Sequence, residues 1–201
     1  MNKIEKNSVD DNFAYYVLER DSGHSYPLIM CDPDSEHTEE YLYDYENEKI
    51  LKPEVMEFTF SEPYFARPVI GDYFSQPESV ISDKLKKILS SLNIFGIQLI
   101  PAMITSNKGD IFKDYFYIHI YNMINAMDKL NSKFDEGDDC YFIDKFKLDE
   151  NILKNIPLEE RLIFKLGEDH TIMLYHRSIV EALMTVKPTG LKFIKVEDWH
   201  I

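Results

Sequence analysis

The first candidates for chemistry are acidic side chains at alternate positions. Asp32, Asp34 and Glu36 have the spacing of a loop that binds a cation through oxygen ligands, and four more acids surround a glycine in residues 135–139. The first stretch lacks the glycine that the helix-loop-helix calcium motif needs at its sixth position. Tyr43 stands where that motif has a bidentate glutamate. We therefore interpret both stretches as solvated runs of charge and predict no metal site.

The histidines and cysteines lack the spacing of a metal site or of a nucleophilic catalyst. No two of the six histidines form an HxxxH or HExxH arrangement, and Cys31 and Cys140 are not part of a CxxC pair. We expect both cysteines to be reduced thiols, because the chain has no disulfide framework. It also has no GxSxG motif and no glycine-rich phosphate loop. The sequence therefore predicts no cofactor and identifies no catalytic residue.

A segment rich in acids and tyrosines is the strongest candidate for a binding surface. Residues 32–48 contain eight acids and no lysine or arginine. Tyrosine supplies rigid contact area, and the surrounding carboxylates attract a basic partner and pair with its cations. The predicted contact residues are Asp32, Asp34, Glu36, Glu39, Glu40, Tyr41, Tyr43, Asp44, Glu46 and Glu48. An acidic loop or edge segment that keeps a strand from aggregating is an equally good interpretation.

The net charge narrows the kind of partner further. The 201 residues carry 36 acids and 22 bases, a formal net charge of −14, which argues against binding to nucleic acid or to an anionic membrane. Residues 1–50 hold 13 acids and 4 bases, whereas residues 151–201 hold 7 of each. No apolar run has the length of a signal segment or of a membrane span, so we expect a cytoplasmic protein.

The elements that would position these residues are those of an α+β fold. Alternating or β-preferring side chains predict strands at residues 13–20, 26–31, 55–60, 114–121, 141–148, 162–166 and 172–175. No long Gly/Ser-rich or Pro-rich linker divides the chain. We expect a single compact domain over residues 1–201 with a mixed or mainly antiparallel sheet.

Two segments of the chain share one plan. When residues 82–100 are laid without gaps over residues 176–194, both show apolar residues at i, i+3, i+4 and i+7, which predicts one face of a helix. Gly96 and Gly190 then fall at equivalent places after the helix, and a strand-like tetrad follows each glycine. The segments form either a structural repeat or two unrelated helix-turn-strand units, since that pattern is common.

The motifs of these segments resemble a known family. Residues 80–89 and 96–101 look like the signature of the MXAN-type immunity domain of bacterial polymorphic toxin systems, formerly catalogued as a domain of unknown function. Residues 190–199 are similar to the usual ending of that family. The resemblance extends over residues 55–201, to which Glu57-Phe58 and the block from Asp114 to Asp128 also contribute. Residues 1–54, where most of the acid lies, match loosely and are expected to vary with the toxin.

The second segment departs from the family pattern at two places. His176 stands where the first segment has Ser82, a better helix-capping residue, so the start of the second helix is less certain than that of the first. Lys195 replaces the proline at position 101 of the first segment.

The resemblance implies an immunity protein. Such a protein is a cytoplasmic, non-catalytic partner that binds a cognate toxin and blocks it, and its gene normally lies beside the toxin gene. For this chain the acidic segment would face a basic surface on the toxin. Two alternatives stay open. One is an enzyme that reverses toxin damage, with His24, His170 or His176 as acid-base residues, and the other is an acidic regulatory or scaffold module unconnected with toxins.

Overall fold

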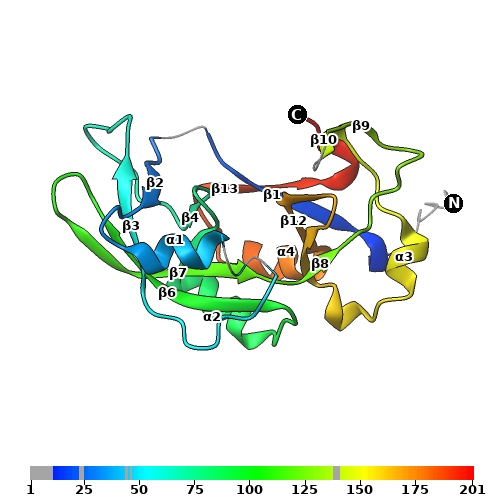
Figure 1. Ribbon diagram of the computed structural model, residues 1–201, viewed down its shortest axis with the longest axis horizontal. Helices are drawn as coiled ribbons and strands as arrows, with labels where there is room; N and C mark the ends of the chain where they lie inside the picture. The colour runs from blue at the N-terminus through cyan, green and yellow to red at the C-terminus, as the bar shows by residue number, and fades with distance from the viewer. Residues whose placement is uncertain (1–10, 23–24, 44, 46, 138–140) are drawn as a thin grey trace, which may run out of the picture.

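The structure is a computed structural model that describes residues 11–22, 25–43, 45, 47–137 and 141–201. Its strands form a six-stranded sheet, a five-stranded sheet and a two-stranded ribbon, with few helices (Figure 1). Within the described residues, β3 pairs with β6 and β8 pairs with β11 in parallel, and the other strand pairs are antiparallel. The predicted α+β fold with a mainly antiparallel sheet is confirmed.

The strands differ greatly in length. In spatial order, the six-stranded sheet contains β2 (Leu28–Cys31), β3 (Met56–Ser61), β6 (Ile97–Thr105), β7 (Ile111–Ile120), β5 (Val80–Ser82) and β4 (Tyr73–Phe74). The five-stranded sheet contains β13 (Leu191–Lys195), β1 (Tyr15–Arg20), β12 (Asp169–His176), β11 (Ile163–Leu166) and β8 (Met123–Ile124). The ribbon pairs β9 (Lys133–Glu136) with β10 (Tyr141–Lys145).

Helices are short and sit between these strands. The α-helices are α1 (Glu36–Tyr43), α2 (Asp83–Ser91), α3 (Glu150–Lys154) and α4 (Arg177–Met184). Single 3₁₀ turns are present at Asp11–Phe13, Leu158–Glu160 and Val196–Asp198. None of the helices in the described residues is long and apolar enough to cross a membrane.

The two predicted helix-turn-strand segments belong to a structural repeat. We define unit 1 as β4, β5, α2, β6 and β7, and unit 2 as β11, β12, α4, β13 and β1. At the end of β5, Ser82 lies opposite Tyr115 of β7, and at the end of β12, His176 lies opposite Tyr15 of β1. The first residue of β6 lies opposite the last residue of β7, and β13 is placed in the same way on β1. Equal registers at both contacts favour a repeat over two unrelated units.

The turns after the two helices also have the same backbone. Gly96 and Gly190 have φ angles of 74° and 84°, a conformation that side chains with a Cβ rarely adopt. Three residues before each glycine, Asn93 and Lys187 are the only described residues other than glycine with positive φ, at 47° and 49°. The glycine spacing seen in the sequence therefore marks a shared turn.

The helix starts invert the sequence-based expectation. His176 caps α4, because its Nδ1 accepts a hydrogen bond from the backbone N–H of Ser178 at 3.3 Å. Ser82 precedes α2 without a capping hydrogen bond from its side chain. Its hydroxyl donates instead to Asp72 Oδ1 at 2.7 Å. The start of the second helix, which the sequence left less certain, is therefore the one with the side-chain cap.

The two units pack against each other through equivalent residues. Leu85 and Leu89 of α2 and their counterparts Ile179 and Leu183 of α4 lie in one buried cluster, which also takes side chains from both sheets. The apolar spacing that predicted a helix face is therefore the spacing of this shared core. A second cluster lies under α1 on the six-stranded sheet, and a third joins the five-stranded sheet to the C-terminal Trp199.

Candidate functional site

The middle of the acidic segment, residues 36–43, forms the helix α1 where the composition suggests a loop or edge. Thr38, Tyr41 and Leu42 are its buried residues, and their i, i+3, i+4 spacing is that of a helix face. Threonine and tyrosine hide this periodicity when only aliphatic residues are counted as apolar. Just before the helix, the Asp32 carboxylate accepts from the Asp34 backbone N–H at 3.1 Å, and the Ser35 hydroxyl is bonded to the Thr38 hydroxyl at 2.9 Å.

The inner side of α1 is fastened to the strand that follows it. Thr38 Oγ1 accepts from the backbone N–H of Glu57 at 2.9 Å. The Tyr41 hydroxyl accepts from the N–H of Glu54 at 3.2 Å, and its side chain is only 8% exposed. Tyr41, one of the predicted contact residues, therefore holds the helix in place and does not present its ring to a partner.

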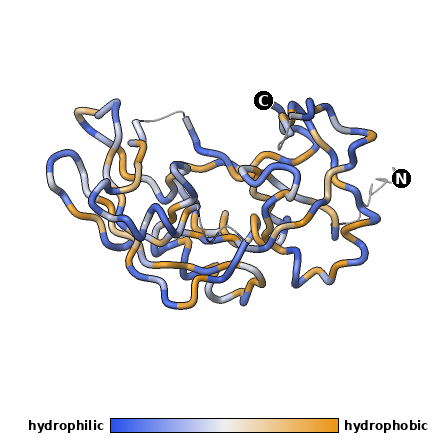
Figure 2. Tube along the Cα trace, viewed as in Figure 1, coloured by the Kyte–Doolittle hydropathy of each residue, from blue (hydrophilic) through white to orange (hydrophobic). Residues whose placement is uncertain are grey.

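Of the remaining predicted residues that the structure describes, Glu36, Glu39, Glu40 and Tyr43 lie on the outer side of α1, and Asp32, Asp34 and Glu48 lie in the segments just before and after it. Asp34, Glu36, Glu39, Glu40 and Glu48 are exposed, Asp32 is half-buried, and the Tyr43 side chain is 66% exposed. In the described part of the chain, none of these six carboxylates has an ion-pair partner. Figure 2 shows α1 largely in the hydrophilic colour. Asp44 and Glu46 lie outside the described residues.

The segment after α1 is held by two neighbouring side chains of unit 1. Gln98 of β6 accepts from the backbone N–H of Ile50 at 2.7 Å and donates to its carbonyl at 2.9 Å. His119 of β7, directly opposite Gln98, donates from Nε2 to the carbonyl of Glu48 at 2.7 Å. Burial lowers the pKa of His119, which favours the neutral ring in this position. The two side chains thus fix the end of the acidic segment on the sheet.

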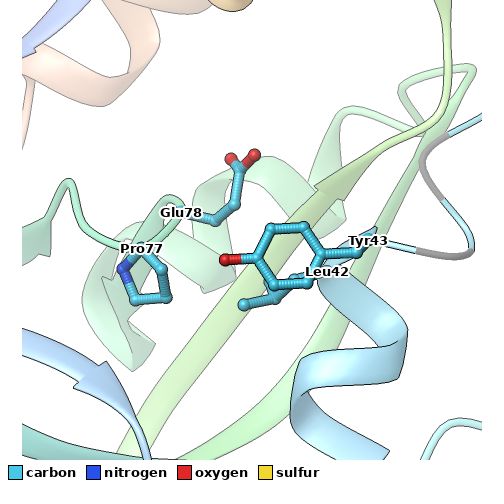
Figure 3. Close-up of a pocket in the computed structure, with 4 residues that line it drawn as sticks. All are labelled: Leu42, Tyr43, Pro77 and Glu78. Carbon is cyan, nitrogen blue, oxygen red and sulfur yellow. The ribbon is translucent and has the colours of Figure 1, made fainter.

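A pocket of about 150 Å³ lies at the C-terminal end of α1. Leu42, Tyr43, Pro77 and Glu78 line it, and Figure 3 shows the Tyr43 hydroxyl pointing toward Pro77, with the Glu78 side chain above the space between them. Glu78 forms an ion pair at 3.2 Å with Lys165, whose side chain comes from β11 of unit 2 and is only 4% exposed. This pair connects the mouth of the pocket to the interior.

Sequence reasoning missed the Glu78–Lys165 pair. The two residues are 87 positions apart, so no local spacing relates them. One signal was present, because Lys165 interrupts the apolar run of residues 162–166, and a lysine in a buried strand needs a partner. Next to this pair, the Tyr73 hydroxyl is bonded to Ser79 Oγ at 3.1 Å, and burial raises the pKa of Tyr73 above its usual range.

The structure places the groups considered for catalysis at separate points of the fold or leaves them outside the described residues. His176 caps α4, His170 is half-buried in β12, and His24 is outside the described residues. Burial, together with the nearby Glu39 carboxylate, raises the pKa of the Cys31 thiol, which disfavours a reactive thiolate. No group of three His, Cys, Asp or Glu side chains within the described residues is arranged to hold a metal ion. Cys140 is also outside that part of the chain.

Comparison with known proteins identifies the family. The chain matches no curated protein. A model of the immunity protein family (Imm11) matches residues 13–198, which include β1, α1 and both units of the repeat. The match also takes in residues 13–54, the part that resembled the family only loosely in sequence. The chain therefore belongs to the Imm11 immunity protein family.

Proposed function

We propose that this protein neutralises a cognate toxin by binding it without catalysis, and that the outer side of α1 contacts a basic surface of that toxin. The observation that carries the proposal is the row of exposed carboxylates on α1 that lack ion-pair partners in the described part of the chain. A helix that served only its own fold would gain by pairing such charges with neighbouring lysines.

Apolar side chains at the border of α1 support the same surface. The Tyr43 side chain is 66% exposed at the end of the helix. Leu51 and Val55, in the segment to which α1 is fastened, are 88% and 48% exposed. Large apolar groups surrounded by charge are typical of protein contact surfaces, where the apolar groups supply burial and the charges supply attraction and orientation.

The same arrangement favours blocking over catalysis. Glu78, the acidic residue of the pocket, is already engaged in an ion pair with Lys165. The polar groups behind it hydrogen-bond one another, as Tyr73 and Ser79 do. Among the described residues that line this pocket, a partner would therefore meet a surface that can bind it and no nucleophile with an adjacent base.

The test uses the toxin encoded by the neighbouring gene. A variant with Glu36→Lys, Glu39→Lys and Glu40→Lys should associate with that toxin at least about tenfold more slowly in low salt and should protect cells poorly. The matched control carries Glu159→Lys, Glu160→Lys and Asp198→Lys, the same charge change at exposed acids of the other half of the chain. Equal association rates for the two variants would overturn α1 as the contact surface.

A catalytic immunity protein gives a different result. If His170→Ala or His176→Ala abolished protection while the toxin still bound with unchanged affinity, the protein would act on toxin damage and the blocking mechanism would be wrong. Under blocking, we expect affinity and protection to fall together in every variant, and the α1 variant to lose both.

A further inference from the structure

The repeat places two tyrosines in equivalent surroundings. Tyr15 packs edge-on against Phe164 with ring centroids 5.5 Å apart, and Tyr115 packs edge-on against Phe74 at the same distance. Each hydroxyl donates a hydrogen bond to the backbone carbonyl two residues before the short outer strand of its unit. The acceptor is Arg161 for Tyr15, at 3.1 Å, and Gly71 for Tyr115, at 2.8 Å.

Unit 2 fills the space beside its tyrosine with its own guanidinium. Arg161 Nη1 donates to the Tyr15 hydroxyl at 2.6 Å and to the carbonyl of Asn12 at 2.7 Å, while Nε donates to the carbonyl of Ile156 at 3.0 Å. The guanidinium also lies 5.1 Å from the centroid of the Phe13 ring, and the residue is 5% exposed. The Tyr15 hydroxyl thus both donates to Arg161 and accepts from it.

Unit 1 cannot fill the equivalent space in this way. The counterpart of Arg161 is Gly71, where an added Cβ would lie 3.0 Å from Tyr26 Cδ1 and 3.3 Å from the carbonyl oxygen of Thr189. Both contacts are tighter than most side chains show, and the second involves backbone, so a side chain at this position would force its neighbours to shift. Any guanidinium beside the Tyr115 hydroxyl must therefore come from outside this unit.

A pocket of about 500 Å³ opens at this place in unit 1. It is lined by residues 82–84 at the start of α2 and by Ile111, Phe112, Asp114 and Tyr115 of β7. The carboxylate of Asp114 is exposed and has no ion-pair partner in the described part of the chain. Burial, followed by the Asp72 and Asp114 carboxylates, raises the pKa of Tyr115 to about 12, so both carboxylates act on its hydroxyl.

Two acids beside this pocket have no acidic counterpart in unit 2. By the strand register, Asp83 and Asp114 of unit 1 correspond to Arg177 and Ala14 of unit 2. Unit 2 thus has a base at one of these positions and an uncharged residue at the other, beside its internal arginine. Unit 1 has an acid at both positions and no internal arginine. Asp83 is paired with Lys87, and Lys84 in the lining is paired with Asp72, so Asp114 is the lining carboxylate that remains for an external cation within the described residues.

We propose that the pocket at the start of α2 receives an arginine side chain of the toxin, whose guanidinium takes the place beside Tyr115 that Arg161 takes beside Tyr15. The guanidinium donates to the Tyr115 hydroxyl and pairs with the Asp114 carboxylate, as its planar fork of donors allows. The identity of the partner rests on the proposed function, whereas the preference for a guanidinium rests on the repeat.

The first experiment needs no toxin. The full chain is titrated with N-acetyl-arginine methylamide and, separately, with the corresponding lysine compound, and amide chemical shifts are recorded by NMR. Arginine should shift the amides of Ser82, Asp83, Asp114 and Tyr115, and lysine at the same concentration should shift them several-fold less. Asp114→Asn should remove the arginine effect, whereas Asp198→Asn, at an exposed acid far along the chain, should not.

Two results would overturn the proposal that this pocket binds arginine. One is equal shifts with arginine and lysine, which would mean general attraction of cations to an acidic protein. The other is an arginine response that survives both Asp114→Asn and Tyr115→Phe. Thermal melts of each variant confirm that a lost response is not a lost fold, because neither change removes a large apolar group from the core.

The second experiment uses the toxin and separates the two proposals. Asp114→Asn should raise the Kd for the neighbouring gene's toxin about tenfold, and Asp198→Asn should leave it unchanged. If the α1 variant weakens binding and Asp114→Asn does not, the proposed function stands and the arginine pocket is wrong. If the unmodified chain does not bind that toxin at all, the proposed function fails, while the NMR titration still decides the chemistry of the pocket.

Discussion

Unit 1 and unit 2 share a strand register but use their surfaces differently. Unit 2 supplies polar partners from its own residues at two places, since His176 caps α4 and Arg161 fills the space beside Tyr15. Unit 1 leaves α2 without a side-chain cap and has Gly71 in place of the arginine. It also extends its sheet with β3 and β2 and fastens α1 to that extension. Under the proposed function, unit 2 is the scaffold of the repeat and unit 1 carries the surfaces that meet the toxin.

The largest expected effects are equal ones, in the shared core. Leu89→Ala in α2 and Leu183→Ala in α4 remove equivalent side chains that are 2% and 3% exposed. Each should lower the free energy of unfolding by about 2–5 kcal/mol, through lost burial and an added cavity. Urea denaturation measures both values. A difference between them larger than about 2 kcal/mol would show that the units do not contribute equally to their common core.

The next largest effect should separate the units. Arg161→Ala leaves the carbonyls of Asn12 and Ile156 without their donor, so we expect a loss of about 2–4 kcal/mol in unfolding free energy. Tyr115→Phe in unit 1 removes one hydrogen bond, to Gly71, and should cost about 1 kcal/mol. If the two variants were equally stable in denaturant, unit 2 would not depend on its internal guanidinium.

A smaller difference in stability is expected for one pair of side chains on neighbouring strands, near the C-terminal ends of β7 and β1. Gln98 and His119 of unit 1 correspond to Lys192 and Glu19 of unit 2, where the pair is a partly exposed salt bridge at 2.9 Å. Gln98→Leu removes two hydrogen bonds to Ile50 and should cost about 1–2 kcal/mol. Lys192→Leu should cost less than about 1 kcal/mol.

Toxin binding should also distinguish the Gln98→Leu and Lys192→Leu variants. Only Gln98→Leu should also weaken toxin binding, because Gln98 holds the segment that follows α1. Unchanged affinity in that variant would mean that the segment keeps its position without the Gln98 hydrogen bonds to Ile50. Isothermal titration with both purified variants measures the affinities.

The smallest expected effect is a pH dependence of stability that comes from His119 of unit 1. Burial lowers the pKa of His119 in the folded protein, so the unfolded chain binds more protons just below its ordinary value of 6.5. The stability that His119 contributes is therefore complete above about pH 6.5 and is lost as the pH falls. The stability advantage of the unmodified chain over His119→Gln should shrink between pH 7 and pH 5. A constant difference in urea midpoints over that range would contradict this reading.

Sequence patterns predicted the local parts of this structure well. Helical spacing and two glycines at an offset of 94 residues located the repeat, because helices and tight turns depend on neighbouring residues. All seven strands predicted from strand patterns overlap observed strands. The short strands β4, β5, β8 and β9 were missed, since two to four residues show little or no alternation.

The sequence could not reveal contacts between distant segments. The insertion of β1 between β12 and β13 leaves no trace in local composition, because strand register is set by partners far along the chain. The pairs Glu78–Lys165 and Arg161–Tyr15 likewise join residues that are far apart in the sequence, so no local pattern predicts them. The acidic residues of the candidate surface were found from charge alone, but the inward position of Tyr41 depends on the helix that charge did not predict.

The position of β1 in the sheet also determines which unit can fold first as the chain is synthesised. In Figure 1, β1 at the blue end of the chain runs beside β13 at the red end. Every strand of unit 1, and α1, has been synthesised once the chain reaches residue 120. Unit 1 can therefore assemble on contacts between segments that are near in the sequence. Unit 2 must wait, since its central strand is the first to be made and its outer strands are the last. The half proposed to meet the toxin is thus the first half able to fold.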